Sequence, residues 1–204
     1  DIASAGELKV ALASDSNPAN MSFAGPGKKL CELEAAIAAG IVINVESPLE
    51  LERIGKLADV GRPRVALRVN PNFELKRSGM RMSGGSKPFG IDAEQIPATL
   101  ARVAELPVDF VGFHIFSGAQ NLNADAIIES QIKSLDLALT LSDNAPNAPG
   151  FNTIGGGFGI PYFPGDQPLH LDSIGDNLYA LSAKLEERMP GCELVIELGR
   201  YIVG

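Results

Sequence analysis

Residues Val108–Phe116, which read VDFVGFHIF, form a nearly continuous apolar run. Strands that are buried on both faces of a parallel sheet have this pattern, whereas strands with one solvent-facing side alternate apolar and polar residues. The run Arg64–Val69 has the same character. Helical patterns lie between the two runs and after them. The sequence therefore predicts a parallel α/β architecture.

The same alternation of apolar runs and helical stretches extends along the whole chain. Four more runs predict strands: Asn20–Ala24, Ile41–Val45, Phe151–Ile154 and Glu193–Leu198. Stretches with apolar residues at helical spacing predict helices at Lys29–Ala39, from Ser47 to about Asp59, and at Asp92–Leu106, Ala124–Ser142 and Ile174–Arg188. The first residues, Asp1–Ser4, have the character of the end of one further strand.

Two architectures fit such a series, an open doubly wound sheet and a (β/α)₈ barrel. The six runs and the truncated one leave the chain one strand short of eight. Its 204 residues are also fewer than the roughly 250 of a full barrel. We therefore predict a single domain, residues 1–204, with the fold of a TIM-type (β/α)₈ barrel that lacks its first βα unit.

The composition limits which binding partners and which cellular location are expected for the protein. The chain is 45% hydrophobic and 21% charged, as a soluble globular domain is, and its formal net charge of −8 argues against nucleic acid as a partner. Cys31 and Cys192 do not have the spacing of zinc ligands, and we expect both to be buried and no metal to be bound. Low cysteine use favours a cytoplasmic location. No apolar run of about 18 residues predicts a membrane span.

In parallel barrels the working residues lie where strands end and the following loops begin. Gly155, Gly156 and Gly157 directly follow a predicted strand, and Arg200 follows the next one. Backbone N–H groups of glycines and an Arg guanidinium both suit a phosphate, and barrels often bind phosphate after their last two strands. The alternative is a glycine-rich turn without a ligand. The polar loop Pro71–Gly90 is long enough to be functional as well.

Three more polar residues stand at predicted strand ends. His114 is either a core histidine or a flat group that stacks on a ring, and Ser117 could donate to a phosphate. Glu197 lies in an apolar strand, where a carboxylate needs a partner. That partner is either Arg200, in a structural ion pair, or the protonated nitrogen of a pyridine ring, which is the electron sink that stabilises a carbanion.

Taken together, these residues resemble the pyridoxal-phosphate-dependent decarboxylases with an alanine-racemase-like barrel, which act on diaminopimelate, ornithine or arginine. The similarity is closest to the diaminopimelate-decarboxylase-like enzymes found with bacterial exosortase systems. The segments that carry it are in family order: Asp1–Leu8, Ser22–Lys28, Asn44–Ser47, Leu67–Pro71, Ser86–Gly90, Gly112–Ser117, Ile154–Gly159 and Glu197–Tyr201.

The resemblance implies pyridoxal 5′-phosphate as cofactor and a role for each site residue. By it, His114 stacks on the pyridine ring, Glu197 pairs with the ring nitrogen and Arg68 lies near the phenolic side of the ring. Ser117, the three glycines and Arg200 hold the phosphate. The carboxylate favours decarboxylation over racemisation, because the racemases of the family have an Arg there. The family often has Gly where Phe116 stands and Pro where Leu198 stands, and Pro88 interrupts its usual Lys-Phe-Gly.

The resemblance also implies that the complete enzyme has a catalytic lysine and a second domain outside residues 1–204. The Schiff-base lysine of the family precedes Asp1, and its C-terminal β-domain follows Gly204, so we expect residues 1–204 alone to be inactive. The full-length enzyme is expected to be a homodimer that decarboxylates an amino acid, diaminopimelate or a related substrate. Three alternatives stay open: a pyridoxal-phosphate-dependent racemase, a homologue that binds the cofactor without catalysis, and a different phosphate-binding barrel.

Overall fold

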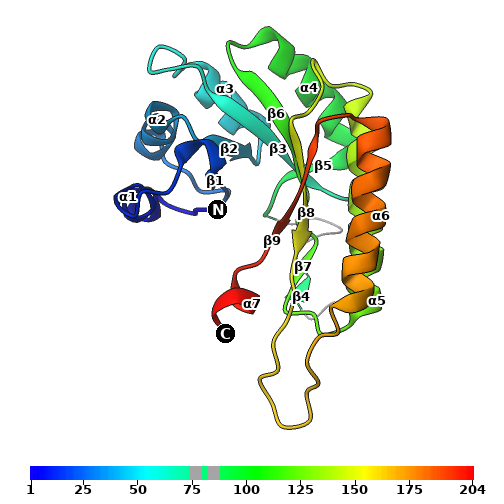
Figure 1. The fold of residues 1–204 in the computed structure, drawn as a ribbon. Coiled ribbons are helices and arrows are strands. Elements are labelled where there is room, and N and C mark those ends of the chain that lie inside the picture. The colour runs from blue at the N-terminus through cyan, green and yellow to red at the C-terminus, as the bar shows by residue number, and fades with distance from the viewer. Residues whose placement is uncertain (74–79, 82–87) are drawn as a thin grey trace.

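The computed structural model describes residues 1–73, 80–81 and 88–204. Its main sheet has the strand order β1-β2-β3-β6-β8-β9, and every neighbouring pair is parallel (Figure 1). The strands of this path are β1 (Ser22–Phe23), β2 (Val42–Val45), β3 (Arg64–Asn70), β6 (Asp109–His114), β8 (Phe151–Gly156) and β9 (Glu193–Glu197). All six match predicted runs. Most of the predicted loop Pro71–Gly90 lies outside the described residues.

The order of the strands distinguishes the two predicted architectures. Position in the sheet follows position in the chain from β1 to β9, without the reversal that defines a doubly wound sheet. A single winding direction is the topology of a (β/α)₈ barrel. The structure is therefore a partial α/β barrel, as predicted. The segment Asp1–Ser4 is not a strand: it makes one parallel bridge, from Ile2 to Phe23 at the edge of the sheet.

Helices lie before, between and after these strands. They are α1 (Ala5–Ala13), α2 (Leu30–Ala39), α3 (Pro48–Gly55), α4 (Ile96–Glu105), α5 (Ala124–Ser142), α6 (Asp172–Arg188) and the short α7 (Arg200–Val203). Figure 1 shows α5 and α6 side by side along β8 and β9, and these two helices contact one another. Within the described residues no helix is both long and apolar enough to span a membrane.

Local sequence signals fix the ends of two helices. The Ser47 side chain accepts a hydrogen bond from the Glu50 N–H at the start of α3, and Pro48 is the first helical residue. A serine cap followed by proline at the first helical position is a favourable helix start. Gly40 ends α2 with φ of 71°, a left-handed conformation that glycine adopts without strain.

Some predicted details are wrong. The helix expected from Asp92 begins at Ile96, after a 3₁₀ turn at Ala93–Gln95, because the Asp92 carboxylate accepts a hydrogen bond from Asn70 instead of capping the helix. Cys31 is exposed on α2, whereas Cys192 is buried as expected. The structure adds α1 and three two-residue strands that were not predicted: β5 (Ile91–Asp92) beside β3, and β4 (Met80–Arg81) paired antiparallel with β7 (Gly118–Ala119).

The core explains why the central strands read as continuous apolar runs. In β3 every residue after Arg64 is buried, and in β6 Phe113 has no exposed surface. Apolar side chains of the helices, such as Leu33, Leu51 and Leu100, pack with those of the strands in one buried cluster. In contrast β9 is only half-buried, since it is an edge strand of the described sheet. Its C-terminal residue, Glu197, therefore lies between the core and an open cleft.

Candidate active site

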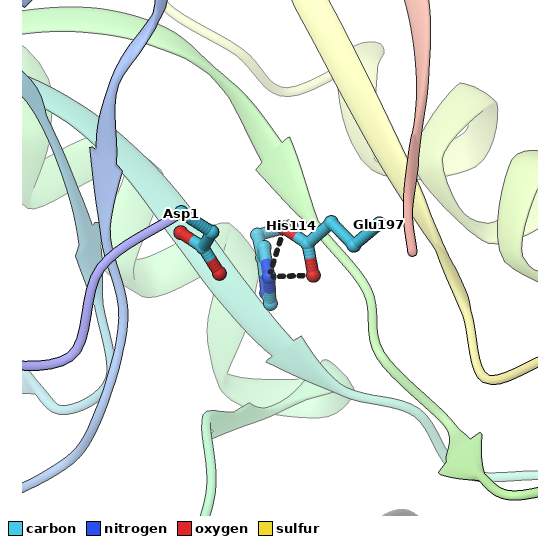
Figure 2. A group of neighbouring side chains, drawn as sticks. All are labelled: Asp1, His114 and Glu197. Atoms are coloured by element: carbon cyan, nitrogen blue, oxygen red, sulfur yellow. Dashed lines mark hydrogen bonds and ion pairs between the residues drawn. The ribbon is translucent and has the colours of Figure 1, made fainter. Parts of the chain in front are cut away.

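The ends of β6 and β9 bring His114 and Glu197 into contact. The His114 Nε2 atom lies 3.0 Å and 3.2 Å from the two carboxylate oxygens of Glu197 (Figure 2). An ionised carboxylate only accepts hydrogen bonds, so the Nε2 atom carries the proton. The two strands are not neighbours, since β8 lies between them. Their side chains meet across β8 because both stand at the carboxyl ends of their strands, which is where the sequence placed them.

Two opposing effects act on the carboxyl group of Glu197. Burial disfavours its charged form, but the hydrogen bond and charge of His114 and the charge of Arg68 favour it more strongly. The net result is a pKa of Glu197 below its ordinary value. Glu197 is therefore an anion at neutral pH and suits a cationic partner.

Asp1 completes a three-residue cluster at the same place. Its carboxylate faces His114 in Figure 2, and the nearest ligand atoms of Asp1, His114 and Glu197 lie within 4.8 Å of one another. Asp1 also accepts a hydrogen bond of 2.5 Å from the Ser22 hydroxyl. The cluster concentrates negative charge around one buried imidazole.

A Glu197–Arg200 ion pair, the structural alternative from the sequence, is not formed. Arg200 instead donates from Nη1 to the Gln120 side-chain oxygen at 3.3 Å, and its guanidinium lies 5.5 Å from the centre of the Tyr162 ring. Gln120 is bonded in turn to the backbone of Ile160 through both ends of its amide. The Arg200 side chain is exposed, so its charge is available to a ligand at the cleft.

The backbone conformation and the close packing of strands at Gly155, Gly156 and Gly157 require glycine. Gly155 and Gly157 have φ of 77° and 69°, in the left-handed region that other residues avoid. Gly156 stands opposite Glu197 in the β8–β9 register, and a Cβ there would lie 2.0 Å from the Glu197 carbonyl oxygen. The missing side chains thus allow β9 to approach β8 closely enough to place Glu197.

Replacing Gly156 with alanine is therefore expected to push the end of β9 away from β8. Overpacking of this kind destabilises a protein by about 1–3 kcal/mol. Chemical denaturation of the Gly156→Ala variant should show that loss. Gly175→Ala on α6 is the matched control, since no atom lies within 4 Å of its Cβ position. Equal stability of the two variants would contradict the close approach.

Ser117 and Arg68 lie deeper than the cleft surface. The Ser117 hydroxyl is hydrogen-bonded to the Ser130 hydroxyl of α5, and both line a small pocket beside Gly156 and Gly157. Arg68 is buried, forms a 2.7 Å ion pair with Glu46, and lies 5.0 Å from the centre of the Phe89 ring. Its charge reaches Glu197 through space.

The sequence interpretation assigned no part in the site to Glu46, which connects three loops. Its Oε1 atom accepts from the Gly25 N–H and from Arg68, and its Oε2 atom accepts from the Gly90 N–H. Beside it, a buried ion pair joins Lys28 and Glu50 at 3.2 Å. The available signal for Glu46 was its position directly after β2. At the start of α1, the Ser4 side chain accepts a hydrogen bond from the Glu7 N–H, and the Glu7 carboxylate accepts one from the Ala3 N–H.

An open cleft of about 1330 Å³ runs beside these residues. Its lining includes Glu197, Arg200, Gly157 and Phe116. A ligand in the cleft could therefore meet a carboxylate, a guanidinium and the last residue of the glycine turn within one space. The fold and the site together define a class of protein: a partial α/β barrel with an imidazole, a carboxylate and a guanidinium gathered at the carboxyl ends of its strands.

Comparison with known proteins identifies the family. The model for the pyridoxal-binding domain of the pyridoxal-dependent decarboxylases matches residues 1–204. The chain therefore belongs to the pyridoxal-dependent decarboxylase family, of which it is the pyridoxal-binding barrel domain. The subgroup associated with exosortase systems, which the sequence suggested, is not distinguished by this match.

Relatives of known activity support the same assignment. The chain is 36% identical over 209 residues to the L-glutamyl-[BtrI acyl-carrier protein] decarboxylase of Niallia circulans, covering the whole chain and 49% of that protein. It is 30% identical over 207 residues to diaminopimelate decarboxylase of Methanothermobacter thermautotrophicus, covering 48% of that protein. The chain thus spans about half the length of these relatives.

Solved structures agree on the fold. Diaminopimelate decarboxylase of Helicobacter pylori, solved in complex with L-lysine, superimposes with a TM-score of 0.84 at 26% identity, over 98% of this chain and 50% of that one. Diaminopimelate decarboxylase of M. jannaschii gives 0.82 at 29% identity, over 96% and 47%.

Proposed function

We propose that this chain is the cofactor-binding barrel of an enzyme that decarboxylates an amino acid with pyridoxal 5′-phosphate. The observation that carries the proposal is the contact between His114 and Glu197 at the strand ends, next to the glycine turn. It rests also on membership of the family. The racemase alternative is disfavoured by the carboxylate at position 197.

The residues present fit the cofactor chemically. Glu197 is an ionised acceptor for a protonated ring nitrogen. Arg200 is an exposed cation, and it lines the same cleft as Gly157, the last residue of the glycine turn. His114 Nδ1 is buried and has no hydrogen-bond partner among the described residues, as expected of a group that belongs to a larger site.

Each side chain then has a task. Pyridoxal phosphate supplies a protonated pyridine ring that accepts the electrons left on the α carbon when carbon dioxide departs. Glu197 keeps the proton on the ring nitrogen by charge pairing. Arg200, Ser117, Gly155, Gly156 and Gly157 hold the phosphate and so orient the ring, and Arg68 adds positive charge on its phenolic side.

We propose diaminopimelate or a related amino acid as the substrate, following the relatives that carry this activity, and the exosortase-associated subgroup as the nearest functional group. A second candidate has support of its own. The identity of 36% to the L-glutamyl carrier-protein decarboxylase exceeds the 30% to the Methanothermobacter diaminopimelate decarboxylase. A glutamyl group attached to a carrier protein is therefore the alternative substrate.

The test uses the full-length protein, which we propose to be a cytoplasmic homodimer. Purified protein is incubated with pyridoxal phosphate, and the visible absorbance of the bound cofactor and the release of carbon dioxide are measured. The substrates are diaminopimelate, ornithine, arginine and L-glutamyl carrier protein. Cofactor binding with decarboxylation of one substrate is expected, and residues 1–204 alone should release no carbon dioxide. Failure of the full-length protein to bind the cofactor would overturn the proposal.

A further inference from the structure

Four polar side chains stand at or near the carboxyl ends of four strands of the sheet. Glu46 directly follows β2, Arg68 lies near the end of β3, and His114 and Glu197 end β6 and β9. Arg68 and His114 are Cα partners in the β3–β6 register, so Arg68 is the neighbour of the residue that donates to Glu197. In the order of the strands, the Arg68 cation therefore stands between two carboxylates.

The two carboxylates interact with Arg68 in different ways. Glu46 pairs with it directly, at 2.7 Å between Nη1 of Arg68 and Oε1 of Glu46, and both side chains are almost fully buried. Glu197 is influenced by the Arg68 charge through space, and that charge favours its ionised form. A guanidinium that moved away from Glu46 would therefore alter the charge environment of Glu197 as well.

Glu46 is itself held by backbone groups from two distant segments. Its Oε1 atom accepts from the Gly25 N–H, and its Oε2 atom accepts from the Gly90 N–H at 3.2 Å. Gly90 has φ of 77°, and a Cβ there would lie 2.9 Å from the Arg68 carbonyl oxygen. The absence of a side chain at Gly90 thus allows its N–H to approach Glu46. Hydrogen bonds to an ionised acceptor are the stronger kind, so the Glu46 carboxylate has a well-defined position.

The residue before Gly90 restrains Arg68 from another direction. The centre of the Phe89 ring lies 5.0 Å from the guanidinium carbon of Arg68, a distance at which a cation and an aromatic face attract each other. One short segment, Phe89–Gly90, therefore contacts the guanidinium and also donates to the carboxylate that pairs with it. These contacts together restrict the rotation of the Arg68 side chain.

Stability alone is a poor explanation for this buried pair. Taking two charges out of water costs about as much as their attraction returns, so a buried ion pair adds little net stability over an apolar pair of similar size. What such a pair does provide is a fixed direction for each side chain. Groups that bind a ligand need this kind of support from their neighbours, because small displacements weaken binding.

We propose that Glu46 is a positioning residue for Arg68: it holds the guanidinium in the direction that suits the cofactor, and it acts on the cofactor only through Arg68. The inference rests on the proposed function, in which Arg68 adds positive charge on the phenolic side of the ring. It extends the site to a residue that follows β2, two strands before His114 in the order of the sheet.

The experiment is a double-mutant cycle on the affinity of the full-length protein for pyridoxal phosphate, measured by absorbance titration. Glu46→Gln removes the charge and one of the two acceptor oxygens. We expect about tenfold weaker binding, the lower end of the effect of removing a group that orients a metal ligand. Arg68→Met should weaken binding by about tenfold or more. In the Arg68→Met background, Glu46→Gln should change the affinity by less than about twofold, because its effect passes through Arg68.

Two more variants distinguish positioning from a general loss of stability. Glu46→Asp keeps the charge on a shorter side chain and should bind the cofactor more tightly than Glu46→Gln. Lys28→Met breaks the adjacent buried pair with Glu50 but leaves Glu46 and Arg68 in place, and it should bind within about threefold of the wild type. Thermal unfolding without the cofactor shows which variants fold. If Glu46→Gln does not fold, Glu46→Asp replaces it in the cycle, where its loss of affinity should likewise vanish without Arg68.

Three results would overturn the inference. One is wild-type affinity in Glu46→Gln. Another is the same loss from Glu46→Gln with and without Arg68, which would show that Glu46 does not act through Arg68. The third is a loss in Lys28→Met equal to that in Glu46→Gln, which would indicate a general effect of disturbed packing. Failure of the wild type to bind the cofactor is a separate result, because it would refute the proposed function itself.

Discussion

Replacing Glu197 with glutamine is expected to lower kcat for decarboxylation by the full-length protein by about 100- to 1000-fold, the range seen when one preorganised electrostatic group is removed from an active site. Glutamine has nearly the same shape but no charge, so it cannot keep a proton on the ring nitrogen. The hydrogen bond from His114 would remain, because the amide oxygen still accepts it. The loss would therefore report the charge rather than the packing.

The matched control lies on the same strand. Glu193 begins β9 and is exposed at the amino-terminal end of the barrel, so Glu193→Gln removes one charge without touching the proposed ring site. Steady-state kinetics of the two variants should differ by at least the factor expected for Glu197. A Glu197→Gln enzyme with kcat within threefold of the wild type would contradict the proposed role of this carboxylate.

Replacing Lys28 with methionine is expected to lower the free energy of unfolding by about 3–5 kcal/mol, which is the usual effect of breaking a buried ion pair from one side. Lys28 Nζ donates to Glu50 and to the backbone oxygens of Gly25 and Asn44, and its side chain is 1% exposed. Burial lowers the pKa of Lys28 and raises the pKa of Glu50, despite their mutual attraction. The loss of one charge therefore leaves the other without compensation.

Two further variants test whether the lost stability comes from the unpaired Glu50 carboxylate. In Lys28→Met with Glu50→Gln both charges are absent, and the Gln side chain can still accept from the Glu46 N–H, so much of the lost stability should return. Lys184 forms an exposed pair with Asp136, and Lys184→Met should change stability by less than about 1 kcal/mol. Urea denaturation measures all three. A double variant less stable than Lys28→Met would show that the methionine, and not the unpaired carboxylate, causes the loss.

The fold was largely predictable because its strands and long helices carry strong periodic signals. The bounds of α5 were predicted to the residue, since apolar positions recur along one face and Asn123 caps its start. In contrast α1 was missed because only Leu8 among its residues is buried, so it presents little apolar pattern. Strands β4, β5 and β7 have two residues each, too few for any period to be visible.

For the site, the sequence predicted which edge of the sheet carries the polar residues but not the contacts that their side chains make. Strand ends of a parallel barrel share one edge, which is why the meeting of His114 and Glu197 could be foreseen. Which group pairs with Glu197 depends on side-chain directions. Arg200 follows Glu197 by three residues but turns toward Gln120, and no pattern in the chain encodes that turn.

Residues such as Glu46, which form hydrogen bonds with several segments that are distant in the sequence, are harder still to predict. Its partners Gly25, Arg68 and Gly90 come from three separate loops or strands. A carboxylate that accepts backbone N–H groups from distant segments leaves no local signature.

The most direct measurement is a crystal structure of the full-length protein with pyridoxal phosphate bound. We expect the pyridine nitrogen within hydrogen-bond distance of the Glu197 carboxylate, about 2.6–3.2 Å. The phosphate should lie against Gly155–Gly157 and Arg200. A cofactor whose ring nitrogen faces a different residue, or whose phosphate is held away from the glycine turn, would contradict the account.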